Sequence, residues 1–129
     1  MKAKTAAIIF GIAFLAVGLL GYVSNPIVGS SEDAIFHTDG LHNIVHLVSG
    51  ALFILVAIAA PASASGFLKI FGLVYLLLGV YGLISMGSEE TAKLLGILHV
   101  NKADNYLHVG LGLIILLVGT MSSRTAKTG

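Results

Sequence analysis

Four long apolar segments, separated by polar ones, divide the chain. They cover residues 6–23, 41–60, 67–86 and 104–121. A helix of about 20 apolar residues is long enough to cross the hydrocarbon core of a bilayer. The pattern therefore predicts an all-α fold, a bundle of four transmembrane helices that forms a single integral membrane domain over residues 1–129.

The first apolar segment follows Lys2 and Lys4, an arrangement that is also typical of a secretory signal peptide. This segment has a counterpart later in the chain, however, because residues 10–21 align with residues 71–82 at an offset of 61. The glycines of the first copy match those of the second; they are Gly11, Gly18 and Gly21 in one and Gly72, Gly79 and Gly82 in the other. We therefore expect a permanent span.

The second and fourth segments are related in the same way, because residues 36–50 align with residues 98–112 without a gap. The two alignments predict two tandem repeats, about 6–60 and 67–121, and each would contain a helix, an outer loop and a second helix. Each repeat would cross the membrane twice, so both would insert in the same direction. Such parallel repeats are related by an axis along the membrane normal.

The connections alternate between long and short. Residues 61–66 form a short turn of proline, glycine and small residues, whereas residues 24–40 and 87–103 form long loops. Within the second long loop, Ser88 precedes two glutamates, a pattern typical of a helix start. We therefore expect a short interfacial helix over residues 88–98, and a polar tail over residues 122–129.

The charges predict the orientation. Five of the seven basic residues lie at the termini or in the short loop, namely Lys2, Lys4, Lys69, Arg124 and Lys127, whereas Lys93 and Lys102 lie beside the long loops. Because cytoplasmic loops collect Lys and Arg, both termini should be cytoplasmic. All six acids would then lie on the outer side: Glu32, Asp33, Asp39, Glu89, Glu90 and Asp104.

The composition agrees with a membrane protein. Charged residues make up 10% of the chain and mean hydropathy is +0.99, whereas soluble domains carry about 25% charged residues. The net charge of +1 and the lack of a basic cluster predict no nucleic-acid partner. The chain has no cysteine, which excludes disulfides, iron–sulfur ligation and thiol catalysis. We expect the bilayer as partner, together with a homo-oligomer or a larger membrane complex.

The second and fourth segments each begin with the motif Asn-x-x-His-x-x-x-Gly. On a helix, residues four apart share one face, so His42 and His46 lie together, as do Asp104 and His108. The glycines that follow each motif allow close helix approach. We therefore predict that His46 and His108 face each other one turn below the outer surface.

Two interpretations of this motif remain open. In the structural one, buried polar side chains form hydrogen bonds that fix the helix packing and the helix starts. That polar cluster would contain Asn43, Asn105, His37, His99 and Asn101. In the alternative, the i, i+4 pairs bind a transition metal (zinc, ferrous iron or copper(II)) or respond to protons. The candidate metal ligands are His42, His46, Asp104 and His108.

The motifs also resemble those of a family. The stretch His99-Val-Asn-Lys-Ala-Asp-Asn-Tyr-Leu-His108 is similar to a phrase found in an uncharacterised bacterial family of four-helix membrane proteins, a domain of unknown function. The earlier stretch, with its paired histidines His42 and His46, is similar to the family's first phrase, except that Thr38 and Asp39 stand where Val and Asn are expected. The resemblance implies the four-helix fold and a bacterial plasma membrane, and it implies no activity.

Together these observations predict a small non-enzymatic membrane protein, an accessory subunit of a larger complex, with no resident cofactor. A metal-binding or proton-responsive protein is the alternative that uses the same cluster. A small transporter is the second alternative, although nothing charged lies near the middle of the spans, where carriers place their sites.

Overall fold

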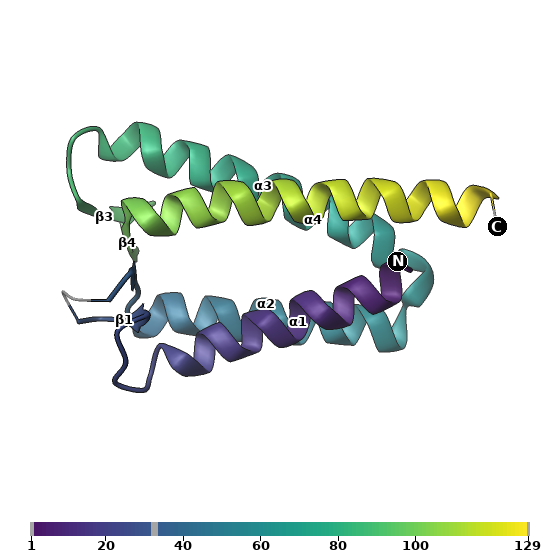
Figure 1. Cartoon of the computed structure of the whole chain (residues 1–129), viewed down its shortest axis with the longest axis horizontal. Helices are drawn as coiled ribbons and strands as arrows, with labels where there is room; N and C mark the ends of the chain where they lie inside the picture. The colour runs from purple at the N-terminus through teal and green to yellow at the C-terminus, as the bar shows by residue number, and fades with distance from the viewer. Residues whose placement is uncertain (1, 32–33, 129) are drawn as a thin grey trace.

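The computed structural model describes residues 2–31 and 34–128, with the side chains of His99 and of residues 123–128 left out. The helices are α1 (Ala3–Leu20), α2 (Gly40–Ala59), α3 (Ala64–Met86) and α4 (Lys102–Thr128), with a single 3-10 turn, η1 (Pro61–Ser63), between α2 and α3. Four helices are long and apolar enough to cross a membrane, as the sequence predicted. Both termini lie at the same end of the bundle as the turn between α2 and α3 (Figure 1).

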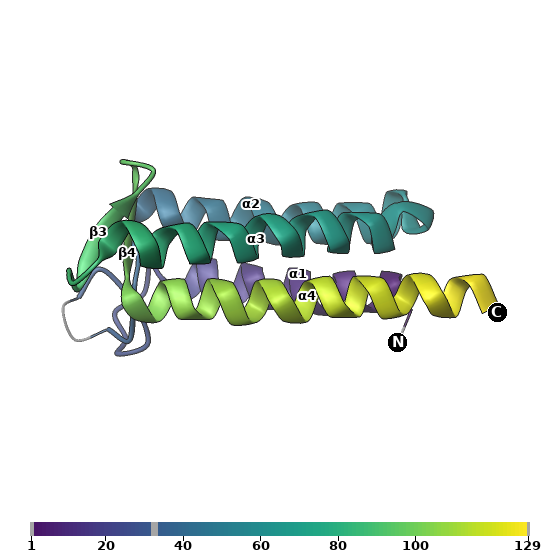
Figure 2. The same ribbon diagram turned by 90° about the horizontal axis from the view of Figure 1, so that it is seen from above.

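The helices stand at the four corners of a bundle. Figure 1 shows the pair of α3 and α4 above the pair of α1 and α2, and Figure 2, seen from above, shows α1 behind α4 and α2 behind α3. The large side chains on the outer faces are exposed, as expected for helices that face lipid; Ile58, Ile70 and Ile84 are examples.

Glycine allows the closest helix contacts. A Cβ atom placed on Gly50 of α2 would lie 2.7 Å from the carbonyl oxygen of Gly11 in α1, and one on Gly112 of α4 would lie 2.8 Å from the carbonyl oxygen of Gly72 in α3. Real Cβ atoms do not approach backbone so closely, so only glycine fits at these contacts. Small residues of this kind let helix backbones pack in a bilayer, where apolar side chains gain little by leaving lipid.

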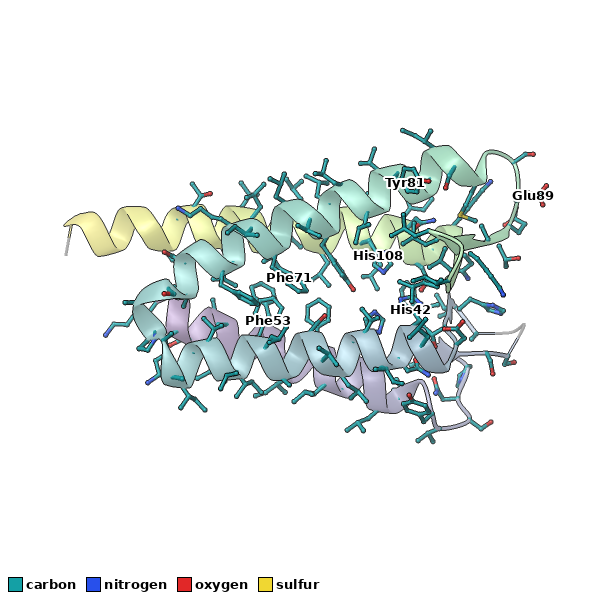
Figure 3. The ribbon with its side chains drawn as sticks, turned by 180° about the vertical axis from the view of Figure 1, so that it is seen from behind. His42, Phe53, Phe71, Tyr81, Glu89 and His108 are labelled. Atoms are coloured by element: carbon teal, nitrogen blue, oxygen red, sulfur yellow. The ribbon has the colours of Figure 1, made fainter. Side chains whose placement is uncertain are left out.

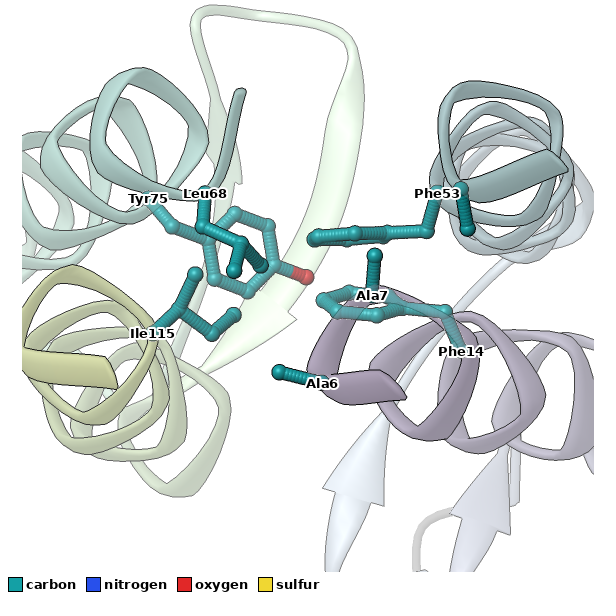
Figure 4. Packing of buried hydrophobic residues seen from close by; sticks show 8 residues of the cluster. Ala6, Ala7, Phe14, Phe53, Leu68, Tyr75 and Ile115 are labelled. Atoms are coloured by element: carbon teal, nitrogen blue, oxygen red, sulfur yellow. The ribbon is translucent and has the colours of Figure 1, made fainter. Parts of the chain in front are cut away.

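Aromatic rings fill the space between the two helix pairs. Phe14 of α1 and Phe53 of α2 meet Tyr75 of α3 at the centre of the bundle (Figure 4). Phe53 and Phe71 have ring centroids 4.5 Å apart, and those of Phe14 and Tyr75 are 5.4 Å apart. Contacts at these distances and in tilted or edge-on geometry contribute about 0.5–1.5 kcal/mol each.

The interfacial helix predicted for residues 88–98 is wrong. This region forms an antiparallel hairpin of β3 (Thr91–Leu94) and β4 (Leu98–Asn101). Its apolar residues alternate along the strands, and Leu94 and Val100 pack with Met86 at the end of α3. A period of two buries one face of a strand but not of a helix. The alternating pattern therefore decided for strands, although Ser88 is a residue that often begins a helix.

Two further details differ from the expectations. The first long loop contains a short parallel pair, β1 (Val28–Gly29) and β2 (Phe36–His37). The polar tail expected over residues 122–129 is helical as far as Thr128, because α4 continues beyond the apolar span that ends at Ser122. Glu32 and Asp33 lie outside the described residues.

The glycine contacts lead to a first prediction. Gly112→Ala should lower the stability of the protein in detergent by about 1–3 kcal/mol, because the new methyl group overlaps the backbone of α3. Gly110→Ala is the matched control on the same helix, because a Cβ atom there meets nothing within 4 Å. It should leave stability unchanged or raise it by about 0.5–1 kcal/mol. Thermal unfolding followed by circular dichroism measures both, and equal melting temperatures would contradict the packing role of Gly112.

Candidate functional site

Three histidines converge near the end of the bundle that carries the strands. They are His42 and His46 of α2 and His108 of α4, here called the histidine cluster. One ring nitrogen from each lies within 4.8 Å of the others, and the residues are only 2%, 5% and 4% exposed. Figure 3 shows His42 and His108 turned towards each other from opposite helix pairs.

The start of α2 places two of these rings. Asp39 caps the helix by accepting a hydrogen bond from the backbone N–H of His42 at 2.8 Å. His42 and His46 are four residues apart and therefore stack along one face, with ring centroids 4.5 Å apart. The cap fixes where the helix begins, and the helix period then directs both rings into the bundle.

His108 supplies the third ring from α4. Its ring centroid lies 5.7 Å from that of His42 and 4.8 Å from that of Tyr75. Both nitrogens of His108 and Nδ1 of His46 are buried without a hydrogen-bond partner among the described residues. A buried polar group left without a partner costs about 1–3 kcal/mol, so these three nitrogens need an explanation that the surrounding packing does not supply.

Asp104 has a different environment from the histidines. Its carboxylate accepts a hydrogen bond from the backbone N–H of Asn101 at 2.8 Å, while the Asn101 side chain accepts from the backbone N–H of Asp104 at 2.9 Å. This reciprocal pair is a capping box at the start of α4. The backbone N–H of His37 also donates to the carboxylate. Asp104 is not among the three residues whose ligand atoms converge, and its role as a metal ligand stays a prediction.

The capping box accounts for the mismatch between His42 and Asp104 in the aligned motifs. Both residues occupy the third position of their helices, after the caps Asp39 and Asn101. In α4 this position carries the carboxylate that closes the capping box, whereas in α2 it carries a ring of the histidine cluster. The spacing Asn-x-x-Asp is a recognisable capping signal in the sequence.

The other described members of the predicted polar cluster lie outside the histidine cluster. Asn43 packs on Gly21, and Asn105 packs on Gly82, so closely that a Cβ atom on either glycine would overlap the amide. The Asn105 amide donates to Sδ of Met86 at 2.8 Å. His37 is half-buried in β2, and the side chain of His99 lies outside the described residues.

Sequence reasoning did not single out Tyr75 as part of the site. Tyr75 is 7% exposed, and together with His46 it lines a cavity of about 50 Å³. A signal was present, because the repeat alignment places Tyr75 opposite Phe14 and so gives one half a hydroxyl that the other lacks. The site therefore contains three imidazoles, with a phenol next to one of them.

These features describe a multi-pass membrane protein with a buried histidine cluster. A family model described as a domain of unknown function (DUF4383) matches residues 4–121, so the chain belongs to this family. No curated protein and no solved structure matches the chain.

The capping box leads to a second prediction. Asp104→Ala should destabilise the protein by about 1–2 kcal/mol, because the backbone N–H groups of Asn101 and His37 lose their acceptor. Asp104→Asn is the matched control, because its carbonyl oxygen still accepts one of these hydrogen bonds, and it should cost less. Thermal unfolding in detergent checks the order, and an alanine variant as stable as wild type would rule out the capping role.

Proposed function

We propose that this chain is a small non-enzymatic membrane protein that binds one transition metal ion at the histidine cluster. The observation that carries the proposal is the convergence of three buried imidazoles from two helix pairs, with three of their six nitrogens unpartnered among the described residues. Imidazole nitrogen is a common protein ligand for zinc, copper and iron.

The distances support this proposal. A metal–nitrogen bond is about 2.0–2.1 Å long, so two tetrahedral ligands lie about 3.3 Å apart. The three nitrogens lie within 4.8 Å of one another, and shifts of about 1 Å at each ring would bring them to that separation. Three histidines leave a fourth coordination position open, as in metal sites that accept an outside ligand.

The neighbouring polar groups support a division of roles. Asp39, Asn101 and Asp104 hold the helix starts, and Asn43 and Asn105 pack on the glycines of the adjacent helices. The structural interpretation of the motif therefore fits the amides and carboxylates, whereas a ligand role fits the imidazoles.

The third prediction tests metal binding directly. Protein purified in mild detergent without chelators and then equilibrated with copper, zinc or ferrous iron should retain about one metal ion per chain. The double variant His46→Ala/His108→Ala should retain none. His37→Ala is the control, because His37 lies outside the histidine cluster, and it should keep the metal. Elemental analysis after gel filtration measures the ratio.

A second measurement separates the ligand sets. The copper(II) form should show nitrogen coupling from imidazole in its electron paramagnetic resonance spectrum, and Asp104→Asn should leave both the spectrum and the ratio unchanged. Loss of the metal in Asp104→Asn would instead make Asp104 a ligand. Wild-type protein that retains no metal would end the proposal, and a pH-dependent change in structure in that protein would favour the proton-responsive alternative.

We also propose that the two halves are tandem repeats in a bacterial plasma membrane with both termini cytoplasmic. The equivalent contacts of Gly21 with Asn43 and of Gly82 with Asn105 support the repeats. The termini share one end of the bundle (Figure 1), so the five basic residues near the termini and the short turn lie on one side.

The fourth prediction concerns this orientation. A reporter enzyme that is active only in the cytoplasm, fused after Gly129, should be active, and the same reporter inserted at Gly96 in the turn between β3 and β4 should be silent. A reporter active only in the periplasm should give the reverse pattern at both sites. Activity of the periplasmic reporter at Gly129 would reverse the orientation and place the histidine cluster at the cytoplasmic face.

A further inference from the structure

A cavity adjoins the histidine cluster at the depth of the membrane spans. Its volume is about 50 Å³, and its polar lining residues are His46 of α2 and Tyr75 of α3. The rest of its wall is apolar and comes from α1 and α4: Phe10, Ala13, Phe14, Val17, Leu107 and Leu111. The cavity is therefore lined mainly by apolar side chains and also by His46, one of the proposed metal ligands.

The cavity is partly open, and its open side faces lipid. Ala13 is exposed, and Phe10, Val17, Leu107 and Leu111 are half-buried, so this wall reaches the outer surface of the bundle. These residues belong to α1 and α4, and both helices are long and apolar enough to cross a membrane. A molecule could thus enter from the hydrocarbon without passing through water.

The size and lining of the cavity restrict what it can hold. An apolar cavity of about 150 Å³ is large enough for benzene. A volume of about 50 Å³ is a third of that and favours a single atom such as xenon or a molecule of two or three heavy atoms. The apolar wall disfavours ions and water, because polar groups buried there would lack partners.

The cavity wall carries one hydroxyl group, that of Tyr75. Tyr75 contacts the ring of His108, and Figure 4 shows its hydroxyl directed from α3 towards Phe14 of α1, which also lines the cavity. The cavity is thus apolar over most of its surface, and Tyr75 supplies one O–H group to its wall.

We infer that this cavity binds a small apolar diatomic molecule of the size of dioxygen, nitric oxide or carbon monoxide, which enters from the bilayer between α1 and α4. This inference rests on the proposed function in one respect, since the molecule would bind at the open fourth position of the metal beside His46. Apolar gases favour hydrocarbon over water, so the bilayer serves as their reservoir.

The fifth prediction tests the cavity by itself. Crystals of the metal-free full chain, pressurised with xenon, should show an anomalous peak between His46, Val17 and Leu111. Val17→Phe should abolish the peak, because its larger ring fills the cavity. Ile12→Phe is the matched control on α1, because Ile12 is 58% exposed and does not line the cavity. It should keep the peak, and Leu111→Phe serves as a second filling variant if Val17→Phe does not fold.

The link to the metal is tested with carbon monoxide on the copper(I) form. Infrared spectra should show one bound carbon monoxide band in wild type and in Ile12→Phe. The band should fall at least tenfold in a Val17→Phe protein that retains its copper. No xenon peak in wild type, or a peak unaffected by both filling variants, would overturn the cavity site.

The remaining outcomes separate the two proposals. A xenon peak in a protein that retains copper but shows no carbon monoxide band would overturn the link between the cavity and the metal. A protein that retains no metal at all would overturn the proposed function, while the xenon peak would still support a cavity that binds small apolar molecules.

Discussion

The close approach of paired helices at glycine is the contact on which the other features depend. At Gly11 with Gly50 and at Gly72 with Gly112, a single added methyl group would overlap the neighbouring backbone. Packing of this kind holds helices together in lipid, where apolar side chains gain little by leaving the solvent. Because each pair is tightly joined, α2 and α4 keep fixed rotations, and those rotations direct His42, His46 and His108 into the bundle rather than towards lipid.

The contacts between the α1/α2 pair and the α3/α4 pair are made mainly by rings rather than by glycines. The end of this interface near the strands holds the imidazoles. The end near the chain termini holds aromatic rings, such as those of Phe53 and Phe71. Tyr75 lies where the two parts meet, in contact with both His108 and Phe14. The buried histidine cluster is thus bordered on one side by a layer of packed aromatic rings.

Much of the fold could be predicted because its signals are local. Four apolar segments of membrane length, and the helical spacing of His42 with His46, depend only on residues near each other in the sequence. The hairpin of β3 and β4 was missed because two local signals competed in this loop, a period of two for a strand and a cap for a helix. Leu94 and Val100 alternate so as to pack on Met86, and the short span of sequence carried a competing cap signal at Ser88.

The sequence by itself determined the membrane class, the number of spans and the residues able to form a site, since these follow from composition and period. Only the tertiary structure decided which polar residues meet. Asp104 and His42 occupy equivalent positions, yet one closes a capping box and the other faces His108, because their surroundings come from different parts of the chain. The cavity beside His46 likewise exists only where four helices come together, so no single segment encodes it.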